Sequence, residues 1–373
     1  MTPKPITDSP GGPRAVAPPG PASPPTVREI VLDTDGVPLS GLLGEPADGP
    51  PRATVVALHG GGMRAGYFHG PAHPGLSLLT LGARLGFTVL ALDRPGYGRS
   101  AVHLPHGQNL REQCATVRAA LTDFGLRHPV GAGVFVVAHS YGGKLALALA
   151  ADGTDLIGLD ICGLGHRFAV DPGQLASLHE RRTAALHWGP LALYPADTFR
   201  LAAALVGPMP EREEREARHW PRLFPALAAR VRVPVRFTFA EYERWWRHDE
   251  EAVAELTGLL AAARVRVDRL PGAGHNVSLG WAARAYHLRA LAFLEECLAA
   301  HRPAARRSAR PDGGSEPSDG RSEPFGGGPA PFGGRPAPVG GGSVPVSRPG
   351  AGAGPPPARP ARRRDWPARS APG

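Results

Sequence analysis

A serine in the setting of a nucleophile lies within the segment VFVVAHSYGGKLALALA, from Val134 to Ala150. The apolar, mostly β-branched start of this segment predicts a buried strand, and its Ala/Leu-rich end predicts a helix. Ser140 falls at the sharp turn between them, where its hydroxyl would be held over the end of a sheet. Strand and helix backbones nearly touch at such a turn, so the residues two before and two after the serine must be small. Ala138 and Gly142 meet this requirement.

The sequence AHSYG around this serine resembles the G-x-S-x-G nucleophile elbow of the α/β-hydrolase family, with Ala138 in place of the first glycine. The segment DRPGYGRS, at 93–100, is similar to the D-x-x-G-x-G-x-S loop of the same family. That loop is mainly structural, so Asp93 is not expected to be the catalytic acid. The resemblance covers about Thr26 to His301 and implies that Ser140 is the nucleophile.

A glycine-rich turn follows the apolar run ATVVAL, which predicts a central buried strand at 53–58. Three glycines after His59 leave the backbone free to aim N–H groups at a ligand. The segment HGGG resembles the oxyanion loop of the family. The resemblance implies the Gly61 N–H as one oxyanion donor and the Tyr141 N–H as the other, with Gly62 as the competing choice for the first.

The acid of the family usually follows a strand of the type V-P-V-L-V and a glycine, three positions after that glycine. PVRFTF at 234–239 predicts such a strand, and Ala240 takes the glycine position. The resemblance therefore implies Glu243 as the acid, a role in which the family accepts Glu as well as Asp. Glu241 is a rival. Asp160 is another, because some members place the acid after the strand predicted at 156–161.

The loop PGAGHN follows the last predicted strand and carries His275. Its glycines let the loop bend so that the imidazole points back toward the serine, and no other histidine of the chain has this context. Ser140, Glu243 and His275 follow the Ser–acid–His order of the family. Each comes at the carboxyl end of a predicted strand, where open α/β sheets place their ligands.

The remaining elements predict an α/β-hydrolase fold with a mostly parallel eight-stranded sheet, helices on both faces and a helical cap inserted at about 163–230. Strands are predicted at 28–33, 37–43, 53–58, 87–92, 134–138, 156–161, 234–239 and 264–270. Helices are predicted at 76–85, at 110–124, after Ser140 and at 281–300, with cap helices at 174–186, 197–206 and 212–219. Side chains that either line an apolar pocket or pack the cap onto the body are Trp188, Tyr194, Phe199, Met209, Trp220 and Phe224.

Composition separates the folded part of the 373-residue chain from its ends. Residues 1–25 are rich in proline, and residues 302–373 are Pro, Gly, Ser, Ala and Arg with few aliphatic side chains, so neither is expected to fold. The domain is predicted at 26–301. Of the net charge of +9, twelve Arg and five acids after residue 301 contribute +7. A basic tail is able to contact nucleic acid or anionic lipid, but a solvated low-complexity extension is the simpler interpretation.

The three cysteines and the lengths of the apolar runs indicate the cellular compartment of the protein. Cys114, Cys162 and Cys297 are odd in number and widely spaced in apolar surroundings, which is typical of buried thiols in a reducing compartment. The sequence contains no apolar run of about 18 residues and no apolar core of a secretory signal, so neither a membrane span nor secretion is expected. We expect a cytoplasmic protein that needs no cofactor and no metal.

These features predict a serine hydrolase that cleaves a carboxylic ester or related acyl bond in a small apolar substrate. His275 would accept the serine proton, and Glu243 would hold the imidazole in the correct tautomer. Haloalkane dehalogenases and epoxide hydrolases of this family use Asp as nucleophile, which Ser140 excludes. Thioesterase, lactonase, amidase, C–C hydrolase, haloperoxidase and acyltransferase activities stay open, as does a non-catalytic protein that binds a ligand in the same pocket.

Overall fold

A computed structural model describes residues 25–170 and 184–308, with side chains described as far as residue 300. All of these residues belong to one compact unit. The predicted disordered ends lie outside the described residues, except for Pro25 and the last turns of a C-terminal helix that continues to Ser308.

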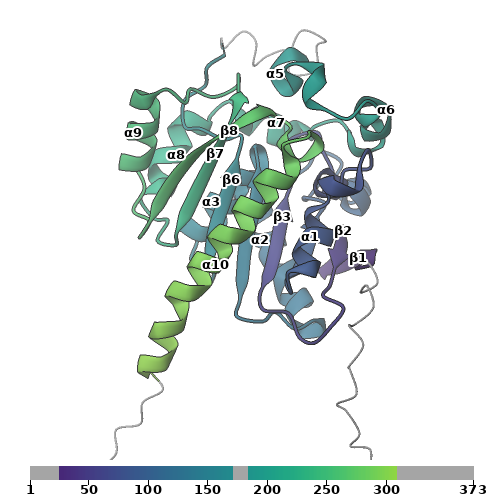
Figure 1. Ribbon diagram of the computed structural model, residues 1–373, viewed down its shortest axis with the longest axis vertical. Coiled ribbons are helices and arrows are strands. Elements are labelled where there is room, and N and C mark those ends of the chain that lie inside the picture. Colours follow the sequence, from purple (N-terminus) through teal and green to yellow (C-terminus); the bar gives the residue numbers. More distant parts are fainter. Residues whose placement is uncertain (1–24, 171–183, 309–373) are drawn as a thin grey trace, which may run out of the picture. The chain divides into compact units, whose positions relative to one another are not determined.

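An eight-stranded sheet forms the centre of this unit (Figure 1), in the order β1-β2-β4-β3-β5-β6-β7-β8. Its strands are β1 (Val27–Thr34), β2 (Val37–Gly44), β3 (Thr54–Leu58), β4 (Thr88–Leu92), β5 (Val134–His139), β6 (Gly158–Cys162), β7 (Val235–Tyr242) and β8 (Val265–Gly274). β1 and β2 are antiparallel, β2 is antiparallel to β4, and all other neighbours are parallel. The predicted α/β-hydrolase fold with a mostly parallel eight-stranded sheet is confirmed.

The turn between β1 and β2 shows how local sequence sets the first pairing. Asp35 and Gly36 have φ angles of 54° and 88°. A two-residue hairpin turn of type I′ requires positive φ at both central positions, and Asp-Gly is among the pairs that adopt it at least cost.

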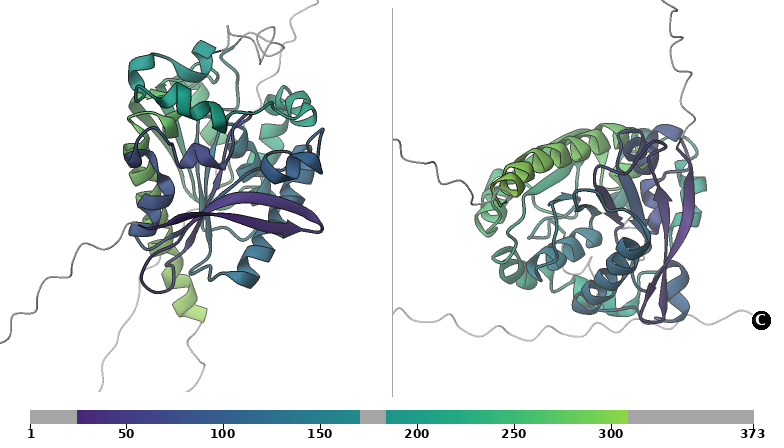
Figure 2. Two further views of the ribbon diagram at one scale, coloured as in Figure 1. Left: turned by 90° about the vertical axis from the view of Figure 1, so that its right-hand side faces the viewer. Right: turned by 90° about the horizontal axis from the view of Figure 1, so that it is seen from below.

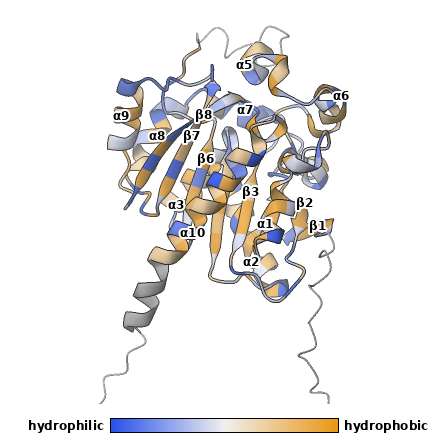
Figure 3. Cartoon of the chain, in the orientation of Figure 1, coloured by the Kyte–Doolittle hydropathy of each residue, from blue (hydrophilic) through white to orange (hydrophobic). Residues whose placement is uncertain are grey.

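Helices cover both faces of the sheet (Figure 2) because its central strands are apolar on both sides. Every residue of β3 and β4 is buried, and Figure 3 shows apolar residues along β3. Val56 and Leu58 belong to one core cluster and Val55 and Ala57 to the other, as the two-residue period of a strand requires. The first cluster contains α2 (Leu110–Arg127), α3 (Tyr141–Ala151) and α8 (Trp220–Ala228), and the second contains α1 (Leu78–Arg84) and α10 (Ala283–Ser308).

The segment between β6 and β7 holds the helices of the predicted cap. They are α5 (Ala184–Trp188), α6 (Thr198–Ala202), α7 (Glu211–Ala217) and α8. We call α5, α6 and α7 the cap helices; they lie beyond the carboxyl ends of the central strands (Figure 1). Most of the helix predicted at 174–186 falls outside the described residues.

For two of the aromatic side chains that were expected either to line a pocket or to pack the cap onto the body, the structure shows packing. Trp220 and Phe224 are fully buried in the cluster that packs α8 onto α3. Trp188, Tyr194 and Phe199 contact one another, with ring centroids 5.0–5.7 Å apart. Helix α9 (Glu250–Gly258), which the sequence analysis did not predict, begins at the N-cap Asp249, whose side chain accepts a hydrogen bond from the Ala252 N–H.

Hydropathy along the helices bears on membrane insertion. Across 25–170 and 184–308, no helix combines the length and the apolar character needed to cross a membrane.

Candidate active site

Ser140 forms a strained turn between β5 and α3. Its φ and ψ are 51° and −117°, a region that residues with a side chain rarely adopt. The close approach of α3 to β3 explains why the chain turns within one residue: a Cβ on Gly142 would lie 2.2 Å from the Leu58 carbonyl oxygen. The turn leaves Ser140 half-buried at the carboxyl end of β5 and at the N-terminus of α3.

His275 and Glu243 are brought together by the ends of β8 and β7. The His275 Nδ1 lies 2.8 Å from the Glu243 Oε2, and both residues are buried. The Trp245 N–H donates to the other carboxylate oxygen at 2.9 Å. These contacts fix the carboxylate and require that the imidazole proton sit on Nδ1, which leaves Nε2 as an acceptor.

The two rival acids are engaged elsewhere. Glu241 is exposed and accepts a hydrogen bond from the Gly272 N–H at 2.7 Å. Asp160 is fully buried and pairs with Arg236 at 2.5 Å. Among the three candidate acids, only Glu243 is hydrogen-bonded to His275; its catalytic role stays a prediction.

The charge of Glu243 follows from its partners. Burial alone would raise the pKa of the carboxyl group, but the nearby His275 and the hydrogen bonds from His275 and the Trp245 N–H bring that pKa below its usual value. Glu243 is therefore a carboxylate near neutral pH.

The loop that carries His275 lies against the elbow. His139, which precedes the serine, donates from Nε2 to the His275 carbonyl oxygen at 2.9 Å, and the two rings are 4.8 Å apart. In the described part of the chain, no hydrogen bond joins the Ser140 hydroxyl to His275. Such contacts often tighten only in the complex with substrate, so proton transfer here requires the two side chains to move into hydrogen-bond distance.

The candidate oxyanion donors differ in what they already bind. The Gly62 N–H donates to the Tyr97 hydroxyl at 3.0 Å, which leaves it occupied. The amides of Gly61 and Tyr141 have no acceptor among the residues that the structure describes. Gly60 lies beside the serine, since a Cβ on it would be 3.1 Å from the Ser140 Cβ. Of the three amides that the sequence analysis named, those of Gly61 and Tyr141 are therefore the two without an acceptor among the described residues.

A second histidine, which the sequence analysis did not single out, lies in the site. His187 of α5 has its ring centroid 6.0 Å from that of His275 and 4.9 Å from that of Trp245. Burial, together with the neighbouring His275, lowers the pKa of His187 to about 3, so it is neutral. No local pattern distinguishes His187, because its place beside His275 arises only when the cap folds over the sheet.

Lys144, one turn after Ser140 on α3, is the least expected charge near the site. The side chain is buried, and Nζ lies 5.0–6.0 Å from the ring centroids of four aromatic residues. Its hydrogen bond, 3.2 Å long, goes to the carbonyl oxygen of Ala217. Burial lowers the pKa of Lys144 to about 7. The four rings belong to Tyr141, Phe168, Trp220 and Trp246.

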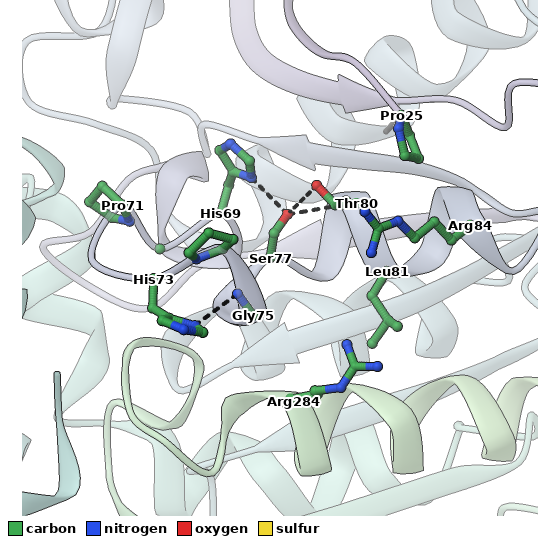
Figure 4. A pocket seen from close by; sticks show the side chains of 12 residues that line it. Pro25, His69, Pro71, His73, Gly75, Ser77, Thr80, Leu81, Arg84 and Arg284 are labelled. Carbon is green, nitrogen blue, oxygen red and sulfur yellow. Dashed lines mark hydrogen bonds between the residues drawn. The ribbon is translucent and has the colours of Figure 1, made fainter. Parts of the chain in front are cut away.

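Two hollows in the described surface lie away from these residues. One of about 460 Å³ lies between α1 and the start of α10. Figure 4 shows His69, Ser77 and Thr80 joined by hydrogen bonds at this hollow, with Arg84 and Arg284 beside them. Neither this hollow nor a second beside β1 is lined by Ser140, Glu243 or His275. Within the described ranges, no group of three or more His, Cys, Asp or Glu side chains is arranged to hold a metal ion.

Comparison with known proteins gives a family match over most of the folded part. The sequence profile described as the Alpha/beta hydrolase family matches residues 55–286. A highly thermostable carboxyl esterase from Bacillus coagulans is 17% identical, with 73% of this chain and 99% of that chain covered and a TM-score of 0.54. A bacterial membrane phospholipase A is 17% identical (73% and 86% covered, TM-score 0.53), and the thioesterase domain of the curacin biosynthetic pathway is 16% identical (71% and 99% covered, TM-score 0.52). At this identity, the solved structures show a shared fold.

The backbone strain at Ser140 predicts a gain in stability when the strain is removed. A non-glycine residue in such a conformation costs about 1–3 kcal/mol. We expect Ser140→Gly to exceed Ser140→Ala in free energy of unfolding by about 1 kcal/mol. Glycine removes the strain that the Cβ of alanine keeps, and its greater freedom in the unfolded chain offsets part of this gain. Urea unfolding of the two variants checks this. Equal stability would contradict the prediction, because the strain would then be no larger than the cost of glycine's freedom in the unfolded chain.

The lowered pKa of Lys144 predicts a pH-dependent cost. Between about pH 7 and the ordinary pKa of 10.5, the unfolded chain binds a proton at this side chain that the folded chain lacks. The stability of the wild type should therefore rise with pH across this window. Lys144→Met should be the more stable protein at pH 7, by an amount on the order of a few kcal/mol, and this advantage should shrink toward pH 10.

Urea unfolding from pH 6.5 to 9.5 measures this difference. The exposed Arg111, changed to Met, is the control, and its effect should not vary with pH. A Lys144→Met effect that is constant with pH would show that the amine keeps its ordinary pKa.

Proposed function

Because the chain belongs to the alpha/beta hydrolase family, we propose that it is a serine hydrolase that cleaves a carboxylic ester or related acyl bond. The observation that carries the proposal is the buried hydrogen bond of 2.8 Å between His275 Nδ1 and Glu243 Oε2, beside a serine held at φ 51° at the same edge of the sheet. A structural role alone would not call for a strained serine next to a paired imidazole.

The proposed reaction proceeds through an acyl-enzyme. The Ser140 oxygen attacks the carbonyl carbon while His275 Nε2 takes the hydroxyl proton, and the Glu243 carboxylate stabilises the imidazolium that forms. The tetrahedral intermediate then expels the alcohol, which receives that proton from His275. A water molecule, deprotonated by His275, attacks the acyl group and releases the acid and Ser140. These steps draw on protein groups alone.

The developing negative charge on the carbonyl oxygen needs donors already in place. We propose the amides of Gly61 and Tyr141 for this role, which is supported by their freedom from protein acceptors among the described residues. The positive end of the α3 dipole adds to the stabilisation. Donors of this kind typically contribute about 10²–10³ in rate.

The substrate is proposed to be a small molecule with apolar groups. Side chains from the cap segment that approach the site include His187, near His275, and Met209, whose sulfur would lie 3.1 Å from a Cβ on Gly61. A neutral imidazole and a thioether favour an uncharged substrate surface. Thioesters, lactones and acyl acceptors other than water would use the same acyl-enzyme.

We also propose that the protein works in the cytoplasm. Cys114, Cys162 and Cys297 are free and buried. Unpaired thiols fit a reducing compartment, where disulfides are rare.

A labelling experiment with a kinetic control tests the proposed function. A fluorophosphonate probe should label the wild type at Ser140, and Ser140→Ala should abolish labelling. Glu243→Gln should lower kcat on p-nitrophenyl esters by about 10²–10⁴, because the imidazole loses the carboxylate that sets its tautomer. Glu241→Gln, a change to an exposed carboxylate two residues away, should leave kcat unchanged.

Each part of the proposal has its own outcome that would contradict or change it. Labelling that survives Ser140→Ala would place the nucleophile elsewhere, and an equal loss in both glutamate variants would remove Glu243 from its role. Turnover of thioesters or lactones in preference to p-nitrophenyl esters would keep the acyl-enzyme and change the substrate class. A wild type that neither labels nor turns over any of these compounds would favour a non-catalytic ligand-binding protein.

A further inference from the structure

Arg94, two residues after the end of β4, is fully buried and reaches the backbone of the loop that contains Gly61. Its Nε donates to the His59 carbonyl oxygen at 2.7 Å, and one terminal nitrogen donates to the Gly60 carbonyl oxygen at 3.2 Å. His59 completes the arrangement. Its Nε2 accepts from the Arg94 N–H at 2.9 Å, so Nδ1 carries the proton and donates to the same Gly60 oxygen at 2.8 Å.

Holding the Gly60 carbonyl fixes the direction of the next amide. The peptide between Gly60 and Gly61 is trans, so its C=O and N–H point in opposite directions. With the oxygen turned toward Arg94 and His59, the Gly61 N–H must point away from them. Gly60 lies beside Ser140, so we infer that an N–H directed away from Arg94 and His59 faces the serine.

The same guanidinium packs on the residue that supplies the other proposed donor. The Arg94 Cζ lies 4.7 Å from the centre of the Tyr141 ring. A single side chain therefore contacts the backbone of the loop that contains Gly61 and the ring of Tyr141, the residue whose amide is the other proposed donor.

Arg94 is in turn held by the cap. Both terminal nitrogens donate to Glu213 of α7, at 2.6 and 2.7 Å, and neither side chain is exposed at all. The Tyr97 hydroxyl and Gln113 Nε2 also donate to this carboxylate, at 2.8 and 3.2 Å. Burial alone would lower the pKa of Arg94, but the Glu213 carboxylate raises it above its ordinary value. If α7 moved away from the body of the protein, Arg94 would lose Glu213 and become a buried charge without a counterion.

We propose that Arg94 is a positioning residue that orients the Gly61 amide for the oxyanion, and that Glu213 makes this orientation depend on the seating of α7. The inference rests on the proposed serine-hydrolase function and goes beyond it by coupling the cap to transition-state stabilisation.

A set of three variants tests this coupling by kcat, KM and inhibition by a trifluoromethyl ketone, whose adduct with Ser140 places an oxyanion between the two amides. Glu213→Gln should lower kcat at least 10-fold and weaken inhibition in parallel, with KM changed less than threefold. Arg94→Met combined with Glu213→Leu removes both charges and keeps apolar bulk, so it should fold even where the single variant does not. It should still show the low kcat and weak inhibition, because the Gly60 carbonyl is no longer held.

Arg212→Ala is the matched control. Arg212 also ties α7 to the body, through Glu112 at 2.7 Å, but it does not contact the oxyanion loop. It should keep kcat and inhibition within twofold of the wild type. Thermal unfolding of each variant establishes that the protein is folded.

Three results would overturn the inference. They are wild-type kcat and inhibition in folded Glu213→Gln, recovery of both in the double variant, and a loss in Arg212→Ala as large as that in Glu213→Gln. Each of these results can be measured only if the wild type is active. Each would therefore contradict the inference about Arg94 and Glu213 without contradicting the proposed function. A wild type without labelling and without turnover would remove the proposed function and this inference together.

Discussion

The tight contact between α3 and the end of β3 is the constraint on which the rest of the site depends. At Gly142 the two backbones leave no room for a Cβ, so the chain must leave β5 and enter α3 within a single residue. Ser140 takes that turn at the cost of an unfavourable φ. A longer turn would relieve the strain, but it would move the hydroxyl away from the end of the sheet and from the N-terminus of α3. The strain is thus the consequence of placing one side chain where a helix dipole and neighbouring strand ends converge.

Much of this arrangement could be predicted from the sequence because it follows from short-range patterns. Fully apolar runs such as those of β3 and β4 predict buried strands, and all eight strands were expected within a few residues of their observed bounds. Parallel strands end at one edge of a sheet, so residues that follow strands, such as Glu243 and His275, could be expected to lie near one another. The preference for Gly61 over Gly62 came from the resemblance alone, because the feature that distinguishes the two amides is the Tyr97 hydroxyl, which occupies the Gly62 amide from another loop.

What the sequence did not reveal are contacts between the cap and the body. Arg94 belongs to a motif that was expected to be structural, and Glu213 belongs to a helix that looks charged and solvent-facing in sequence, yet the two are fully buried against each other. A charged residue carries no local signal of whether its partner is water or another buried charge. The same holds for His187, whose neighbours Trp245 and His275 lie in the loops that follow β7 and β8. Contacts of this kind depend on the tertiary fold of an insertion, which hydrophobic periodicity does not encode.

The buried side chains of Arg94 and Lys144 flank the Tyr141 ring. Their surroundings stabilise the charge of Arg94 and destabilise that of Lys144. Both terminal nitrogens of Arg94 donate to the Glu213 carboxylate. The guanidinium therefore stays charged, and the carboxylate neutralises this charge at hydrogen-bond distance. The Lys144 ammonium group instead donates to the Ala217 carbonyl oxygen and lies over aromatic rings, among them that of Tyr141. Cation–π contacts contribute about 2 kcal/mol each at best, which does not offset the loss of water around an ammonium group, and burial lowers the pKa of Lys144 to about 7. Because its charge is cancelled, Arg94 influences the proposed oxyanion through the geometry of the Gly60 peptide rather than through its field.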